Sequence, residues 1–390
     1  MDDLRPPHRL RPAVRRLARR AAALATAAAL TAVLPVTPAS AGRAEELTLN
    51  RIQSIGTHNS YHAEPNAREF ALISAFAGTQ ANGLQYTHVP LGRQFAGQNV
   101  RQIELDIWAD PDGGRFARPL IRPLTGQSLE YDPRMREKGT KVLHIRDIDY
   151  HSTCVSFVEC LTAVRDWSRA NPSHVPIAIL VEFKDTLELS LPDSFPLPPY
   201  RWTRARMLGL EEEIRSVFSA DDLITPDDVR DDGLTLEQSV LRNGWPSLDA
   251  VRGKVMFLMD NAGSYRDRYV EGNPGLEGRI LFTSSEPGRP DAAFVKRNDA
   301  VGSAEEIRSL VRSGYIVRTR ADADTAQARS GDTSVRDAAL ASGAQWVSTD
   351  YPVPGIADRF GTGYYAALPG FAAARCNPVL TSDGCTVTSP

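Results

Sequence analysis

The sequence lacks a long apolar run, a nucleotide-binding motif and a serine-hydrolase motif. Its longest stretch of small apolar residues, AAALATAAALTAVLPV, has about sixteen residues, fewer than the roughly 20 that a helix needs to cross a bilayer. Neither GxGxxG nor GxxxxGK[ST] occurs, which argues against the usual dinucleotide and nucleotide sites. No GxSxG elbow surrounds Ser60, so a serine nucleophile has no sequence support there.

Positive charge is outnumbered by negative charge outside the first residues. An arginine-rich start, the apolar run and TPASAG together resemble a secretory signal peptide, with cleavage expected after Ala41. Removing residues 1–41 takes away seven arginines and two aspartates, so the net charge changes from −3 to −3 − 5 = −8. An acidic mature chain is a poor partner for nucleic acid. We expect a secreted monomer without a membrane anchor, exported by the general or the twin-arginine route.

The four cysteines fall into two close pairs, Cys154 with Cys160 and Cys376 with Cys385. An even number of cysteines in local pairs of an exported chain predicts two disulfides. A metal site is the alternative, although neither pair has the CxxC spacing of a zinc knuckle.

Short apolar runs recur along the mature chain, which has 390 − 41 = 349 residues. Several are apolar at every position, which is typical of parallel strands covered by helices. Eight candidate strands can be placed at 52–56, 100–108, 141–145, 175–183, 253–260, 279–284, 314–319 and 344–350. Amphipathic segments between some of them, such as 303–314, predict helices. This alternation favours a (β/α)8 TIM barrel, with a doubly wound open sheet as the alternative.

Two carboxylates lie within the second candidate strand. Glu104 and Asp106 are two residues apart and therefore point to the same face. Such a pair is unfavourable to bury unless a cation compensates it. Asn59 at the end of the first strand and Glu182 at the end of the fourth would complete a set of oxygen donors that suits calcium or magnesium. A salt bridge to Arg101, Arg146 or Lys184 is the alternative for the two carboxylates.

Two histidines follow the first and third candidate strands. His58 and His144 would face each other across the barrel mouth, where one could take a proton from a nucleophile and the other give one to a leaving group. A structural hydrogen-bonding role is the alternative for each. For His62 and His151 we expect a packing role, with lining of the substrate pocket as the alternative.

Four motifs resemble the catalytic part of the phosphoinositide-specific phospholipases C, and most closely their secreted, calcium-dependent bacterial relatives. In chain order they are THNSY, IELDIW, VLH and PIAILVEFKD. The resemblance covers most of residues 50–355. It implies one phospholipase C-like phosphodiesterase barrel over residues 42–390, with Ca²⁺ as the cofactor and a phospholipid at a membrane or micelle surface as the substrate.

The resemblance also assigns roles to residues. His58 matches the general base for the inositol 2-hydroxyl, and His144 matches the group that protonates the leaving diacylglycerol. Asn59, Glu104 and Asp106 match calcium ligands, and Glu182 matches a fourth. The implied reaction forms an inositol 1,2-cyclic phosphate.

Lys184 and Arg146, each two residues beyond a site residue, are our own candidates for holding phosphate oxygens. Two other functions stay open. One is a glycerophosphodiester phosphodiesterase, although that group typically has arginine after its first histidine. The other is a secreted calcium-dependent binding protein without turnover, which would need no acid and base pair.

Overall fold

Eight parallel strands form the centre of the protein. A computed structural model describes residues 46–186 and 198–388, and the expected signal peptide lies outside the described residues. The barrel strands are β1 (Ile52–Thr57), β2 (Gln102–Trp108), β4 (Ile177–Lys184), β6 (Val255–Met259), β7 (Leu281–Ser284), β8 (Ala292–Lys296), β9 (Ile316–Arg320) and β10 (Trp346–Thr349). Their side chains are almost all buried, as the continuously apolar runs predict.

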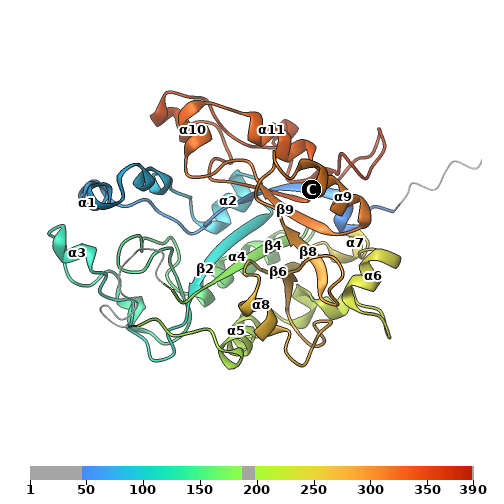
Figure 1. Ribbon diagram of the computed structural model, residues 1–390, viewed down its shortest axis with the longest axis horizontal. Helices are drawn as coiled ribbons and strands as arrows, with labels where there is room; N and C mark the ends of the chain where they lie inside the picture. The colour runs from blue at the N-terminus through green and yellow to red at the C-terminus, as the bar shows by residue number, and fades with distance from the viewer. Residues whose placement is uncertain (1–45, 187–197, 389–390) are drawn as a thin grey trace, which may run out of the picture. The chain divides into compact units, whose positions relative to one another are not determined.

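The strands close into a barrel in the order β1, β2, β4, β6, β7, β8, β9, β10 and back to β1, and all these pairings are parallel. This closure confirms the predicted (β/α)8 barrel over the open sheet. In Figure 1 the strands lie in the centre, with α5 and α8 below them and α10 and α11 above.

Two strand predictions were wrong. The segment 141–145 is not a barrel strand, because only β3 (Lys141–Val142) forms there and it pairs antiparallel with the end of β2. The barrel strand β8 was missed, since its run AAFVK is short and two of its five residues are alanine. The other strands outside the barrel are β5 (Leu223–Ile224), which pairs with β6, and β11 (Arg375–Cys376), which pairs with β1.

The α-helices follow the strands around the barrel. They are α1 (Ala67–Ala77), α2 (Leu91–Gly97), α3 (Ile121–Leu124), α4 (Phe157–Ala170), α5 (Arg204–Val217), α6 (Leu236–Arg242), α7 (Leu248–Val251), α8 (Ser264–Tyr269), α9 (Ala304–Ser313), α10 (Ala326–Ser330) and α11 (Ser334–Ala341). Short 3-10 helices are η1 (Leu49–Arg51), η2 (Gly78–Leu84), η3 (Pro133–Arg136), η4 (Ala220–Asp222), η5 (Pro226–Asp228), η6 (Ile356–Phe360) and η7 (Pro369–Phe371). None of the helices described in 46–186 and 198–388 has the length and hydropathy that crossing a bilayer requires.

Local sequence signals explain the ends of the helices. In α9, Ile307, Leu310 and Val311 are buried on one face, and Gly314 ends the helix in a left-handed conformation with φ 107°. Ser156 caps α4 by accepting a hydrogen bond from the Glu159 amide. Both predicted disulfides are present, Cys154–Cys160 and Cys376–Cys385, and they tie down the segment before α4 and the C-terminal segment.

The barrel closes where β1 meets β2, and a glycine stands at that contact. Gly56 pairs with Gln102. A Cβ added to Gly56 would lie 2.0 Å from Gln102 Oε1 and 2.9 Å from Gln102 Cβ. Gln102 is fully buried, so it has little room to move away.

We therefore expect Gly56→Ala to lower the free energy of unfolding by about 1–3 kcal/mol, as overpacking of a core does. Chemical denaturation monitored by circular dichroism measures this. Gly209→Ala is the matched control, because Gly209 lies on the exposed face of α5 with nothing near its Cβ position. The control should be neutral or more stable, by up to about 1 kcal/mol. Equal effects of the two substitutions would contradict a packing constraint at the closure.

Candidate active site

Three carboxylates meet at the carboxyl ends of β2 and β4. Glu104 and Asp106 lie on β2, and Asp106 is in register with Glu182 on β4. One oxygen from each of the three lies within 4.8 Å of the others. The period-2 spacing within β2 and the parallel pairing with β4 together bring these side chains to one place. The three carboxylates that the sequence singled out are thus neighbours.

Glu104 forms an ion pair with an arginine from the far side of the barrel. Arg318 on β9 donates to Glu104 Oε2, and it also donates to Ser348 Oγ at 3.0 Å and Asn298 Oδ1 at 2.6 Å. Burial raises the pKa of Glu104 to about 7, and the Asp260 and Glu182 carboxylates add to the rise while Arg318 opposes it. The sequence analysis did not single out Arg318.

Lys184 lies beside the other two carboxylates. Its Nζ is 3.4 Å from Asp106 Oδ2 and 3.1 Å from Glu182 Oε1. The salt bridge that the sequence offered as an alternative is therefore present between Lys184 and Asp106. Lys184 and Arg318 thus both lie against the group of three carboxylates.

Asn59 adds an oxygen at the turn after β1. The turn is held to β2 because the Ser60 amide donates to Glu104 O at 2.9 Å and Ser60 Oγ accepts from the Glu104 amide at 2.8 Å. Among the described residues, Asn59 Oδ1 is buried without a hydrogen-bond partner. A buried carbonyl oxygen of this kind, with three carboxylates, fits a hard divalent cation such as calcium.

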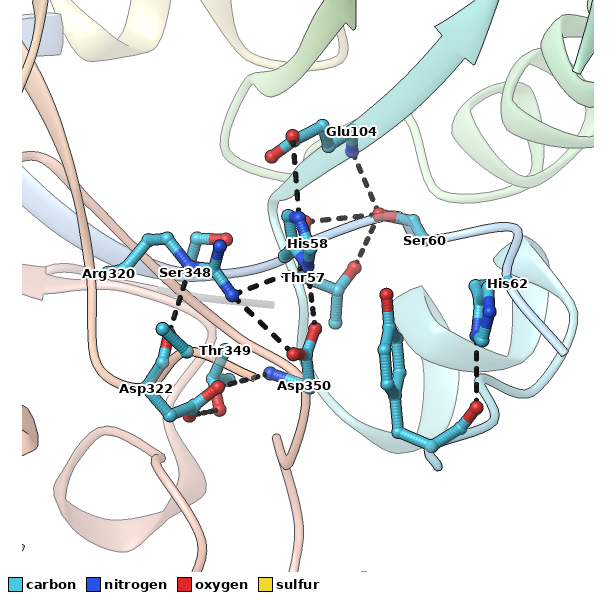
Figure 2. A network of polar contacts seen from close by, with 12 residues as sticks. Thr57, His58, Ser60, His62, Glu104, Arg320, Asp322, Ser348, Thr349 and Asp350 are labelled. Atoms are coloured by element: carbon cyan, nitrogen blue, oxygen red, sulfur yellow. Dashed lines mark hydrogen bonds and ion pairs between the residues drawn. The ribbon is translucent and has the colours of Figure 1, made fainter. Parts of the chain in front are cut away.

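His58 is oriented by a carboxylate that the sequence analysis missed. Its Nδ1 lies 3.0 Å from Asp350 Oδ1, and its Nε2 lies 4.0 Å from Glu104 Oε1. Figure 2 shows His58 between these two residues, with Arg320 beside Asp350. A ring that donates from Nδ1 to Asp350 keeps an unprotonated Nε2, which is the form of a general base. The only signal for Asp350 was its position at the end of the run WVSTD.

The surroundings keep the ring of His58 neutral and in place. Burial lowers the pKa of His58 well below its usual value, and the guanidinium groups of Arg320 and Arg318 lower it further. His88, itself buried, donates from Nε2 to the His58 carbonyl oxygen at 2.9 Å. Asp322 accepts a hydrogen bond from the Asp350 amide at 2.9 Å and so fixes the turn that carries Asp350.

His144 lies in the loop after β3 and has its own carboxylate. Its Nδ1 is 2.7 Å from Asp149 Oδ2, and the same oxygen lies 2.9 Å from His62 Nε2. His62 is fully buried, and its Nδ1 faces the Tyr86 carbonyl oxygen at 3.0 Å. Both ring nitrogens of His62 thus have partners in the interior.

Two further residues named in the sequence analysis contact carboxylates other than these three. Arg146 is 3% exposed, and its Nε lies 3.2 Å from Asp147 Oδ2. Its predicted contact with a substrate phosphate stays a prediction. His151 Nε2 lies 2.7 Å from Glu69 Oε2, in a network with Tyr150 outside the group of carboxylates.

Comparisons with known proteins identify the family and support the fold. The family model "Phosphoinositide phospholipase C, Ca2+-dependent" matches residues 47–378. The chain is similar to the apo form of a calcium-dependent phosphoinositol-specific phospholipase C from the Gram-negative bacterium Pseudomonas sp.. The two sequences are 16% identical, and the TM-score is 0.51. The match covers 85% of this chain and 95% of that one. The structure described as its myoinositol complex gives the same identity and TM-score, with coverage of 85% and 96%. These structures support the fold. No curated protein matches the chain.

We expect Asp106→Asn to weaken calcium binding by at least tenfold to a hundredfold, because it removes a charged oxygen ligand from the centre of the group. Isothermal titration calorimetry measures the affinity. Thermal unfolding gives a second readout, since a ligand that binds the folded state raises the Tm. Asp166→Asn, on the exposed surface of α4, is the control and should bind calcium like the parent protein. Unchanged affinity in Asp106→Asn would place the calcium site elsewhere.

Proposed function

The chain belongs to the Ca²⁺-dependent phosphoinositide phospholipase C family, and we propose that it cleaves phosphatidylinositol to diacylglycerol and inositol 1,2-cyclic phosphate. The observation that carries this proposal is the placement of His58, held by Asp350, next to the group of three carboxylates. Such a site combines a base with a place for a divalent cation, which is what intramolecular attack on a phosphodiester requires.

His58 Nε2 takes the proton from the inositol 2-hydroxyl in this reaction. The hydroxyl oxygen forms a bond to phosphorus, and the bond from phosphorus to the glycerol oxygen breaks. His144 gives a proton from Nε2 to the departing diacylglycerol oxygen. Asp350 and Asp149 each hold one ring through Nδ1, so each histidine exchanges its proton through the opposite nitrogen.

The calcium ion would be held by Glu104, Asp106, Glu182 and Asn59. When bound, it would supply positive charge to the phosphoryl group and the attacking hydroxyl. Lys184 and Arg146 remain our candidates for contacts to phosphate oxygens. Lys184 is better placed, because it already lies beside Asp106 and Glu182.

We also propose that residues 1–41 direct export and that the mature enzyme meets its lipid at a membrane or micelle surface. The disulfides Cys154–Cys160 and Cys376–Cys385 support an oxidising compartment.

A lipid assay tests the reaction. Mature protein is incubated with phosphatidylinositol vesicles, with calcium or with a chelator, and the products are followed by phosphorus NMR. We expect a cyclic inositol phosphate that forms only with calcium. Glycerophosphate as the product would show a glycerophosphodiesterase instead, and no turnover with any metal would favour a binding protein.

His58→Ala and His144→Ala should each lower kcat roughly a hundredfold or more, because each removes one proton-transfer group. Circular dichroism should show an unchanged fold. His151→Ala is the matched control, because His151 contacts Glu69 outside the site, and its turnover should stay close to that of the parent. Near-normal turnover in either site variant would remove that histidine from the mechanism.

A further inference from the structure

Two histidines, His62 and His144, share one aspartate. Asp149 Oδ2 lies 2.9 Å from His62 Nε2 and 2.7 Å from His144 Nδ1. One possible ligand atom from each of the three residues lies within 4.8 Å of the others. The side chains of His62 and Asp149 are fully buried, whereas that of His144 is 18% exposed. The group is therefore compact, and solvent reaches it at His144.

Backbone pairing holds this group together. His62 pairs antiparallel with Ser152, and Ile145 pairs with Asp149 in the same way. The amides of Ile145 and Asp149 each donate to the carbonyl oxygen of the other at 2.9 Å. His144 directly precedes this short hairpin. The three side chains thus meet because two paired backbone segments bring them to one place.

His62 lies between two hydrogen-bond acceptors. Its Nδ1 is 3.0 Å from the Tyr86 carbonyl oxygen (Figure 2), and its Nε2 is 2.9 and 3.1 Å from the two oxygens of Asp149. Burial raises the pKa of Asp149, but the contacts with His62 and His144 outweigh this effect and hold the pKa well below its ordinary value. Asp149 is therefore ionised and can only accept.

A neutral imidazole has a single N–H, so it cannot donate to both of these acceptors. If Nδ1 of His62 donates to the Tyr86 carbonyl oxygen, Nε2 needs a second proton or a metal ion between itself and Asp149. A histidine that donates from one nitrogen to a backbone carbonyl and binds a metal through the other is the usual arrangement in metal sites. The surroundings of His62 are thus those of a metal ligand.

The donor atoms indicate which metal fits. Two imidazole nitrogens and one carboxylate oxygen suit zinc, whereas calcium and magnesium prefer oxygen ligands alone. In a tetrahedral zinc site the ligand atoms are about 3.3 Å apart, because the bonds to zinc are about 2.0–2.2 Å long. The contacts of 2.7 and 2.9 Å to Asp149 are within about 0.6 Å of that spacing. Three protein ligands leave a fourth position for water.

We propose that His62, Asp149 and His144 bind Zn²⁺, separately from the candidate calcium ligands, and that zinc bound there inhibits the enzyme. The binding stands by itself, whereas the inhibition rests on the proposed function. Zinc replaces the ring protons that face Asp149, and these protons pass to solvent. With Nδ1 on the ion, the His144 ring keeps only the proton of a neutral imidazole, which is a much weaker acid than imidazolium. The ring then cannot protonate the leaving oxygen.

Calorimetric titration of the mature protein with Zn²⁺ in excess calcium tests the binding. We expect one zinc ion per chain, and we expect His62→Gln to weaken its binding at least a hundredfold, since the loss of an outer partner alone costs about tenfold to a hundredfold. His174→Gln is the matched control and should bind zinc like the parent. His174 is also buried, but its ring nitrogens lie near neutral atoms, at 2.7 Å from Ser168 Oγ and 2.6 Å from the Val175 carbonyl oxygen.

Two further variants keep the test sharp. Asp106→Asn should retain the zinc affinity of the parent, which separates this site from the candidate calcium ligands. His144→Gln replaces His62→Gln if that variant does not fold, because His144 is partly exposed. Titration with Co²⁺ adds a readout of geometry, since tetrahedral Co²⁺ absorbs visible light strongly. The bands should appear in the parent and in His174→Gln and be absent from His62→Gln.

Turnover of phosphatidylinositol in calcium, with and without Zn²⁺, tests the inhibition. We expect zinc to abolish turnover in the parent and in His174→Gln, and a chelator that prefers zinc to calcium to restore it. A parent protein that binds no zinc in excess calcium, or a folded His62→Gln that binds it equally well, would overturn the site. Zinc binding with unchanged turnover would overturn the inhibition. Zinc binding by a protein that never cleaves phosphatidylinositol would support the site and count against the proposed function.

Discussion

The ion pair between Arg318 and Glu104 organises the active-site end of the barrel. It crosses the interior from β9 to β2, and its two side chains are 1% and 5% exposed. Breaking such a buried pair on one side leaves an uncompensated charge, which is strongly destabilising. The pair fixes Glu104 Oε2, so Glu104 Oε1 is left to face His58 Nε2. The orientation of a calcium-ligand candidate and the surroundings of the base candidate thus depend on one contact.

The two histidines are positioned in the same way, each by a buried aspartate. Asp350 holds His58, and Asp149 holds His144, each through Nδ1. Both aspartates are buried, and both have a further partner that fixes them: the Asp350 amide donates to Asp322, and Asp149 is shared with His62. Each ring is therefore held in one orientation by a buried carboxylate.

The sequence predicted the carboxylates better than their partners. Glu104 and Asp106 were found because side chains two apart on a strand must share a face, which is a local property. The barrel was recognised from its alternating runs, although the short run AAFVK of β8 was missed and 141–145 was taken as a barrel strand. In the segment 141–145, β3 ends after two residues. His144 therefore lies in the loop after β3, where Asp149 orients its ring. Asp350 and Arg318 carried no local signal beyond their positions in or after apolar strands.

The sequence by itself therefore determined the fold class, the shared face of Glu104 and Asp106, the disulfide pairs and the resemblance to phosphoinositide-specific phospholipases C. Only the tertiary structure decided which cations compensate the carboxylates and which carboxylates orient the histidines. Glu104 and Arg318 are 214 residues apart in the chain, and His58 and Asp350 are 292 apart. Strand periodicity follows from backbone geometry within a few residues. These contacts exist only because eight strands close into a barrel, which brings β1 beside β10 and lets β2 and β9 meet across the interior.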